Sequence, residues 1–385
     1  MTATVFFARL RARSTRRAGT GGPSRRPALR AALALVSSAL LLGACASRPL
    51  VPFSTETPPL VLAPATYAGI DDKRERFREI YCAVLEAGAG SVRDYRPCEE
   101  ALTRVAGEPA GTGRPVDVGP SKRRLVAAMV PGVGWDCVDP WLERPDTFGP
   151  HLRAKGYEFA MIKVEALSGS TSNAKQVRDA IMAMSVEAGA PRVVLMGYSK
   201  GAPDILEAVV AYPEIRSRIA AVVSVAGSVG GSPLANPAEQ YQLELMRLFP
   251  GATCGPGDGG AVASMRTGTR RDWLARNPLP EGVRFYSLVT FPHPDRISSL
   301  LKPTYHQLAR VDGRNDGQVI FYDQMIPRST LVGFVNADHW AIAVPIARTH
   351  EIIGASFVDQ NAYPREALLE ALLRFVEEDL AGRTK

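Results

Sequence analysis

The sequence predicts an α/β fold, with a mainly parallel sheet that is covered by helices on both faces. From about residue 123 onward, apolar segments of strand length alternate with segments of helical periodicity, which is typical of parallel sheets with helical connections. Residues 193–196 are four consecutive apolar residues, two of them β-branched, as expected of a strand buried on both faces. Ligands of such sheets bind at the carboxyl ends of the strands. Functional residues are therefore expected just after strands.

The individual elements follow from the same patterns. Expected strands cover residues 125–130, 157–164, 193–197, 220–225, 284–289 and 330–335. Expected helices cover residues 71–86, 94–105, 173–184, 202–212, 236–249 and 366–380. The first helix is indicated by an apolar stripe at helical spacing, formed by Phe77, Ile80, Tyr81 and Val84. Ser172 is a suitable N-cap for the third helix.

Four segments are expected along the chain. Residues 1–44 form a leader, residues 45–66 a Pro-rich tether, residues 67–119 an N-terminal helical addition and residues 120–385 the α/β domain. Within this domain, residues 228–280 form a long insertion between two core strands, as a cap or lid over a binding site does. Residues 291–310 read as a loop rich in proline and histidine.

The stretch Gly197-Tyr198-Ser199-Lys200-Gly201 follows the apolar strand at 193–196 and precedes a helical segment. A serine in a sharp turn from strand to helix is held in a strained backbone conformation that exposes its hydroxyl. Gly197 and Gly201 fit because side chains there would clash with the flanking strand and helix. The pattern therefore predicts that Ser199 is a nucleophile.

These residues resemble the nucleophile elbow of the α/β-hydrolase superfamily, on its lipase and esterase side. The resemblance implies an α/β-hydrolase fold and a catalytic triad in the chain order Ser, then Asp or Glu, then His. Asn315-Asp316-Gly317-Gln318-Val319 resembles the acid-bearing loop of bacterial lipases, which implies Asp316 as the triad acid. Asp312 is the alternative acid, and both could instead be ordinary turn residues.

His339 follows the expected strand at 330–335 and lies 23 residues after Asp316. This position fits the general base of the resembled fold, which would take the proton of Ser199. The other four histidines do not fit, because they either precede the acid or lack a preceding strand. Asp338, the direct neighbour of His339, is interpreted as a loop residue.

The segment Val130-Pro131-Gly132-Val133-Gly134 resembles the His-Gly-x-Gly oxyanion loop of lipases, with Pro131 in the place of the histidine. The resemblance implies that the backbone N–H groups of Val133 and Lys200 form the oxyanion hole. The Lys200 side chain is expected to face solvent, with a role in binding an anionic group as the alternative.

The chain of 385 residues has a net charge of +7, which would ordinarily suggest a nucleic-acid or membrane-surface partner. Residues 1–44, however, contain eight arginines and no acidic residue, so the remainder is close to neutral. No nucleic-acid partner is expected. The positive net charge comes from the leader.

The leader continues into an apolar stretch, residues 31–42, that is too short to span a membrane as an ordinary helix. It ends in Leu42-Gly43-Ala44-Cys45, which resembles the lipobox of a bacterial lipoprotein signal peptide. The resemblance implies a lipid-modified Cys45 and a place in the cell envelope, at the outer membrane and facing the periplasm or the surface. A plain secretory signal is the alternative.

Four further cysteines, Cys82, Cys98, Cys137 and Cys254, read as up to two disulfides in an exported domain, with three possible pairings. Locality favours Cys82 with Cys98, which leaves Cys137 with Cys254. Their spacing does not support a zinc site.

The sequence as a whole predicts an exported serine hydrolase that cleaves carboxylic esters through an acyl-enzyme. The expected substrate is a small-molecule or lipid ester, and no metal or organic cofactor is required. Two alternatives stay open: a non-catalytic envelope binding protein on the same fold, and a peptidase, amidase or thioesterase using the same triad.

Overall fold

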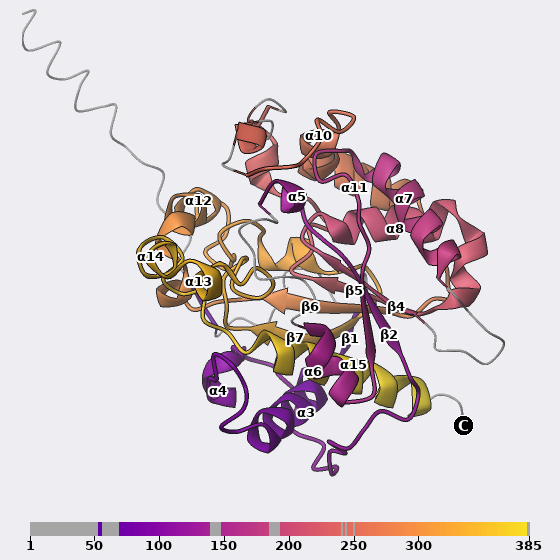
Figure 1. The fold of residues 1–385 in the computed structure, drawn as a ribbon, viewed down its shortest axis with the longest axis vertical. Helices are drawn as coiled ribbons and strands as arrows, with labels where there is room; N and C mark the ends of the chain where they lie inside the picture. The colour runs from indigo at the N-terminus through magenta and orange to yellow at the C-terminus, as the bar shows by residue number, and fades with distance from the viewer. Residues whose placement is uncertain are drawn as a thin grey trace, which may run out of the picture. The chain divides into compact units, whose positions relative to one another are not determined.

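Parallel strands form a single sheet in the order β1-β7-β6-β5-β4-β2-β3 (Figure 1). This computed structural model describes residues 53–55, 69–138, 148–184, 193–239, 242, 245–248 and 251–382. The strands are β1 (Asp71–Asp72), β2 (Val126–Val130), β3 (Glu158–Met161), β4 (Val193–Tyr198), β5 (Ile219–Val225), β6 (Phe285–Thr290) and β7 (Thr330–Val335). The predicted leader, Cys45 and most of the predicted tether lie outside the described residues.

The register aligns the carboxyl ends of the central strands. Gly197 of β4 lies beside Val130 of β2, and Tyr198 lies beside Val225 of β5. The segments that leave these strands therefore meet at one edge of the sheet. Six strands were predicted, five of them with errors of one to three residues at their ends. Strand β1 was missed, because two acidic residues carry no apolar signal.

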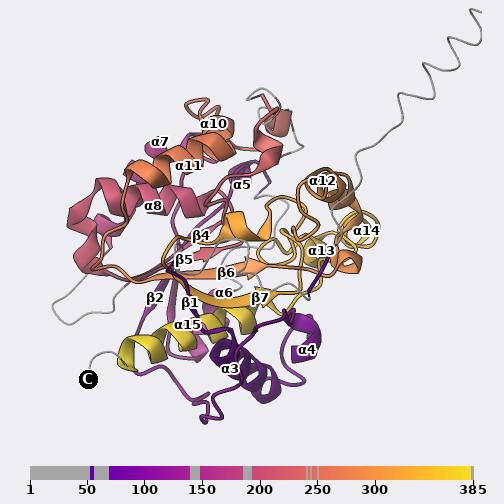
Figure 2. The same cartoon turned by 180° about the vertical axis from the view of Figure 1, so that it is seen from behind.

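Helices cover both faces of the sheet (Figures 1 and 2). One face carries α3 (Arg74–Ala87), α6 (Phe148–Ala154) and α15 (Arg365–Gly382). The other face carries α7 (Ser170–Ala183), α8 (Gly201–Ala211) and α11 (Thr267–Arg276). Two apolar cores result, one between the sheet and α3 with α15, the other between the sheet and α7 with α8. The fold is thus the predicted parallel sheet with helices on both faces.

Shorter elements occupy the connections. Among the described residues, the remaining α-helices are α4 (Cys98–Ala101), α5 (Trp135–Val138), α10 (Ala261–Met265), α12 (Lys302–Leu308), α13 (Ile346–Thr349) and α14 (Glu351–Ser356). The 3₁₀ helices in the described part of the chain are η4 (Pro213–Arg218), η5 (Pro233–Ala235), η6 (Leu245–Leu248), η7 (Pro294–Arg296), η8 (Ser299–Leu301) and η9 (Phe321–Gln324). In the part of the chain that the structure describes, no helix is both long and apolar enough to cross a membrane.

Three helix predictions were wrong in detail. The helix predicted over residues 94–105 shortens to α4, because Pro97 disfavours helical geometry at the residue before it. The helix predicted from Asn236 does not begin there, since the Asn236 side chain accepts hydrogen bonds from Thr267 instead. Ser172 is not an N-cap, because α7 already begins at Ser170.

Two disulfides form among the described residues, and their pairing confirms the prediction. Cys82–Cys98 links α3 to α4, and Cys137–Cys254 links α5 to the insertion between β5 and β6. The second bond ties the segment after β2 to the insertion. Each disulfide limits the freedom of the unfolded chain, and this is one way in which disulfides stabilise a fold.

A short piece of the predicted tether packs against the domain. The Phe53 ring lies 5.5 Å from the rings of both Phe291 and His293, measured between centroids. Thr55 accepts a hydrogen bond from the backbone N–H of Ala106. Residues 53–55 therefore contact the segment that follows β6.

Candidate active site

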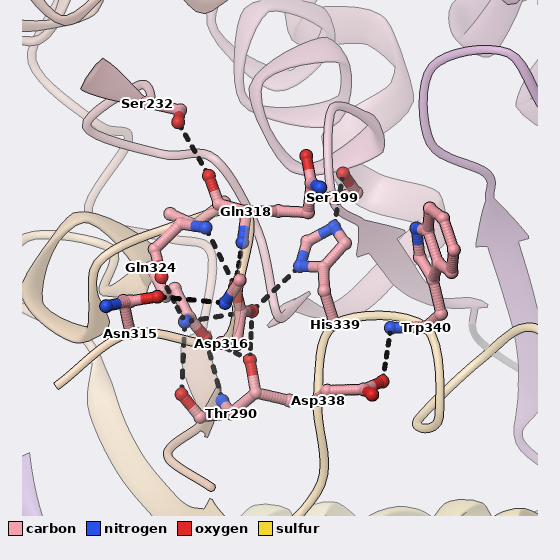
Figure 3. Close-up of polar contacts among 12 residues, drawn as sticks. Ser199, Ser232, Thr290, Asn315, Asp316, Gln318, Gln324, Asp338, His339 and Trp340 are labelled. Atoms are coloured by element: carbon pink, nitrogen blue, oxygen red, sulfur yellow. Dashed lines mark hydrogen bonds and ion pairs between the residues drawn. The ribbon is translucent and has the colours of Figure 1, made fainter. Parts of the chain in front are cut away.

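Three predicted side chains meet at the carboxyl edge of the sheet (Figure 3). Ser199 directly follows β4, Asp316 lies between β6 and β7, and His339 follows β7. Ser199 Oγ is 2.9 Å from His339 Nε2, and His339 Nδ1 is 2.7 Å from Asp316 Oδ2. All three residues are buried, so these contacts are largely shielded from water.

The hydrogen-bond chain fixes the tautomer of His339. A carboxylate only accepts hydrogen bonds, so the ring nitrogen that faces Asp316 carries the proton and donates it. The other ring nitrogen, Nε2, then accepts from the Ser199 hydroxyl. His339 is therefore placed to remove a proton from Ser199.

Ser199 has the backbone strain expected at an elbow. Its φ is +53°, a left-handed conformation that non-glycine residues rarely adopt. The flanking glycines make the turn possible. A Cβ on Gly201 would lie 2.2 Å from the Val130 carbonyl oxygen, and one on Gly197 would lie 2.5 Å from the Ala202 backbone. At both glycines the atoms that a Cβ would meet belong to the backbone, which has little freedom to move. Both positions therefore require glycine.

Asp316 is held by five hydrogen-bond donors. Its Oδ1 accepts from the backbone N–H groups of Gln318 at 2.9 Å and Val319 at 2.7 Å. Besides the histidine, its Oδ2 accepts from the Thr290 hydroxyl and from Gln324 Nε2, the latter at 3.2 Å. Asp316 is therefore fixed in position as a hydrogen-bond acceptor for the imidazole.

The alternative acid, Asp312, does not reach the histidine. Its carboxylate pairs with the Arg314 guanidinium, with distances of 2.8 Å to Nε and 2.6 Å to Nη2. This pair closes the turn that precedes Asp316. The structure thus places Asp316, and not Asp312, beside the imidazole.

The segment around His339 is held by two further residues. Asp338 accepts backbone N–H bonds from Ser298, Trp340 and Ala341, which agrees with its interpretation as a loop residue. Tyr198 donates its hydroxyl to the backbone carbonyl of His339 at 2.8 Å. Burial raises the pKa of Tyr198, so its phenol stays protonated and available to donate.

The predicted oxyanion loop packs directly over the nucleophile. A Cβ on Gly132 would lie 2.8 Å from Ser199 Cβ, so the backbone after β2 approaches the serine as closely as a glycine allows. The backbone N–H groups of Val133 and Lys200 have no hydrogen-bond acceptor among the described residues. Lys200 also lies at the N-terminus of α8, where the helix dipole favours negative charge.

The predicted orientation of the Lys200 side chain was wrong. It is 1% exposed, and its Nζ lies 2.9 Å from both carboxylate oxygens of Asp204, one turn later in α8. Asn173 Nδ2 also donates to Asp204, at 2.8 Å. The ammonium therefore faces neither solvent nor a bound anion, because an internal carboxylate neutralises it.

Sequence reasoning missed Thr290 and Gln324, which support the acid. Thr290 is the last residue of β6, one position beyond the predicted end of that strand. Its position at the carboxyl end of a strand could have identified it as a candidate site residue. Gln324 lies in a 3₁₀ turn, and nothing in its local sequence indicates that it contacts Asp316.

Within the insertion between β5 and β6, the segment that forms α11 is anchored to α8. Arg270 is fully buried, with Nη1 2.7 Å from Glu207 of α8 and Nε 3.2 Å from the Val229 carbonyl. Nearer the site, a Cβ on Gly134 would lie 2.3 Å from Met246 Cε, so the insertion also reaches the oxyanion loop. Among the described residues, no group of three His, Cys, Asp or Glu side chains is arranged to hold a metal ion.

Comparison with known proteins gave matches among solved structures. The chain is similar to the metagenomic carboxyl esterase MGS0156, with 39% identity, a TM-score of 0.77, and coverage of 84% of this chain and 97% of that one. It also matches mature Bacillus licheniformis lipase BlEst2 at 20% identity and a TM-score of 0.46, over 59% of this chain and 89% of that one. Staphylococcus hyicus lipase matches at 10% identity and a TM-score of 0.46, over 71% of this chain and 100% of that one. No protein-family model and no curated protein matches the chain.

Proposed function

The chain belongs to the α/β-hydrolase superfamily, among its carboxyl esterases, and we propose that it cleaves carboxylic esters with Ser199 as nucleophile, His339 as general base and Asp316 as the supporting acid. One observation carries the proposal. A continuous hydrogen-bond chain runs from Asp316 through His339 to a serine with a φ of +53°, at the edge of the sheet where ligands bind.

In the first half of the reaction, Ser199 Oγ attacks the ester carbonyl carbon and gives its proton to His339 Nε2. The carbonyl oxygen becomes negatively charged and accepts hydrogen bonds from the Val133 and Lys200 amides. One such donor typically lowers the barrier by about 3 kcal/mol. His339 then returns the proton to the departing alkoxide, which leaves as an alcohol. The product is an acyl ester of Ser199.

In the second half, water takes the place of the alcohol. His339 removes a proton from the water, whose oxygen attacks the acyl carbon. The same amides stabilise the second oxyanion. Collapse of this intermediate returns the proton to Ser199 Oγ and releases the carboxylic acid. Asp316 holds the imidazole in one tautomer throughout and stabilises its protonated form.

An ester panel tests this proposal and separates it from its rivals. The wild type and Ser199→Ala are assayed with p-nitrophenyl esters of rising acyl length and with p-nitroanilide peptides. We expect ester hydrolysis by the wild type, none by Ser199→Ala, and little turnover of the anilides. Preferential anilide cleavage would favour a peptidase or amidase, and turnover of neither class would favour a binding protein.

We also propose that the protein is exported and anchored in the cell envelope through a lipid on Cys45. The lipobox sequence supports this, and two disulfides suit an oxidising compartment. Phe53, which packs on the domain, is eight residues from Cys45. Eight residues span at most about 29 Å, so the anchor would hold the domain close to the lipid.

Metabolic labelling tests the anchor. Cells that express the full chain are grown with an alkyne-tagged fatty acid, and the protein is then captured and examined for the tag. We expect the wild type to be labelled and to sediment with membranes, and Cys45→Ala to lose both properties. An unlabelled, soluble wild type in the periplasm would instead indicate a plain secretory signal.

A further inference from the structure

The backbone of Gln318 is fixed next to the candidate triad. Its N–H donates to Asp316 Oδ1 at 2.9 Å, and its carbonyl accepts from Ser232 Oγ at 2.6 Å. Asp316 itself is held by the last residue of β6 and by the histidine. The position from which the Gln318 side chain projects is therefore set by both the acid-bearing loop and the start of the insertion.

The Gln318 side chain extends from this loop toward Ser199 (Figure 3). The residue is partly exposed, and its carboxamide has no hydrogen-bond partner among the described residues. A carboxamide both donates and accepts hydrogen bonds, so it can bind either atom of a hydroxyl group. Gln318 thus offers a free polar group beside the proposed nucleophile.

The sheet order indicates which part of an ester this group meets. The oxyanion loop follows β2, on one side of β4, whereas Asp316 and Gln318 lie near the end of β6, on the other side. An ester oxygen held by the Val133 and Lys200 amides points toward β2. The leaving oxygen must approach His339 Nε2, which comes from the β6 and β7 side. The alcohol part of the ester therefore lies on the side of Gln318.

We propose that Gln318 is a specificity-determining residue that hydrogen-bonds a hydroxyl group in the alcohol part of the substrate. The substrate class that follows is carboxylic esters of hydroxylated alcohols, such as glycol or glycerol esters. This inference rests on the proposed function, because it takes the positions of the oxyanion and of the leaving group from the proposed mechanism.

The test compares two esters that differ only in this hydroxyl. 2-Hydroxyethyl butyrate and n-propyl butyrate have alcohol parts of similar size, and only the first carries a hydroxyl group. kcat/KM is measured for both with the wild type, Gln318→Met and Gln307→Met. Methionine keeps the length of glutamine but removes the carboxamide, and Gln307 is an exposed residue of α12 that serves as the control.

We expect Gln318→Met to lose about tenfold in kcat/KM for the hydroxyethyl ester, the usual effect of one neutral hydrogen bond. The propyl ester should be cleaved as by the wild type, and Gln307→Met should change neither. Equal losses on both esters, or no loss on either, would overturn the inference. A matched acyl-side pair, propyl 3-hydroxybutyrate and propyl 3-methylbutyrate, adds a further check: a loss specific to the hydroxyacyl ester would overturn the assignment to the alcohol part.

Failure of the inference is distinguishable from failure of the proposed function. If the wild type hydrolyses both esters and Ser199→Ala hydrolyses neither, the proposed chemistry stands whatever Gln318→Met does. If the wild type hydrolyses no ester, the proposed function fails first.

Discussion

Lys200 and Asp204 form a buried ion pair beneath the proposed nucleophile. Each side chain is 1% exposed, and the Lys200 ammonium lies 2.9 Å from both oxygens of the carboxylate. The lysine follows Ser199 directly, so the pair fixes the first turn of α8 from inside. The side chain of the residue after the serine is therefore held inside the fold, and its backbone N–H remains available as the proposed oxyanion donor.

Lys200→Met should destabilise the fold, because it leaves the Asp204 carboxylate buried without its cation. Removal of one partner of a buried pair typically costs about 3–5 kcal/mol in the free energy of unfolding. Urea denaturation measures the loss, and Lys175→Met, at an exposed position of α7, is the control. The double variant Lys200→Met/Asp204→Leu should recover much of the stability. Equal stability of Lys200→Met and Lys175→Met would contradict this account.

Gly201→Ala should abolish folding or activity, whereas Gly268→Ala should be tolerated. A Cβ at Gly201 meets the backbone carbonyls of Val130 and Pro131 at 2.2 and 2.8 Å, and neither can move without displacing β2. Gly268, within α11, has open space around it, and alanine there should stabilise the helix by about 0.5–1 kcal/mol. Soluble yield and thermal denaturation separate the two. A well-folded, active Gly201→Ala would show that the elbow is less tight than described.

Asp316→Asn should lower kcat by about 10⁴-fold with little change in fold, because an amide in place of the carboxylate favours the wrong histidine tautomer. Asp312→Asn is the matched control. It breaks the pair with Arg314 and should reduce stability, but folded molecules should keep the wild-type kcat. Circular dichroism establishes folding, and active-site titration corrects kcat for the folded fraction. If Asp312→Asn lost activity and Asp316→Asn kept it, Asp312 would be the triad acid.

Asp323 should make stability depend on pH. Its side chain is buried, its Oδ2 has no hydrogen-bond partner among the described residues, and burial raises the pKa of Asp323 to about 7. An unfolded aspartate has a pKa of about 3.9. Between these values the folded state binds more protons than the unfolded state, so this group favours folding less as the pH rises from about 4 to 7.

Asp323→Asn removes this titration. The stability of the variant relative to the wild type should therefore increase across the same pH range, by at most about 4 kcal/mol, since one pKa unit corresponds to about 1.4 kcal/mol. Urea denaturation at several values between pH 4.5 and 7.5 measures the difference. Parallel curves for the two proteins would show that Asp323 does not titrate as described.

Much of the sheet could be predicted because buried parallel strands have a strong local signal. The strand at residues 330–335 was predicted with its observed ends, and the expected Ser, Asp and His residues do converge at one edge. Asp316 was implied by the resemblance of its loop to that of bacterial lipases, and His339 was expected because it follows an apolar strand in the chain order of the resembled triad. The backbone donors of Val133 and Lys200 were implied by the resemblance to the oxyanion loop and elbow of lipases.

The side-chain contacts could not be predicted in the same way. Lys200 has a carboxylate four residues later, but that carboxylate also accepts a hydrogen bond from Asn173 of another helix. Asn236 is a residue type that often caps a helix N-terminus, but its side-chain oxygen accepts a hydrogen bond from the backbone N–H of Thr267 instead. Such contacts join residues that are 31 positions apart and leave no periodic signal in the sequence.

The central claim is that Ser199, activated by His339, attacks the substrate. Its most direct test is labelling of the purified protein with a fluorophosphonate, followed by mass spectrometry of the modified peptide. The account predicts one adduct per molecule, on Ser199, with labelling lost in Ser199→Ala and strongly slowed in His339→Ala. A folded wild type that carries no adduct, or an adduct on another residue, would contradict it.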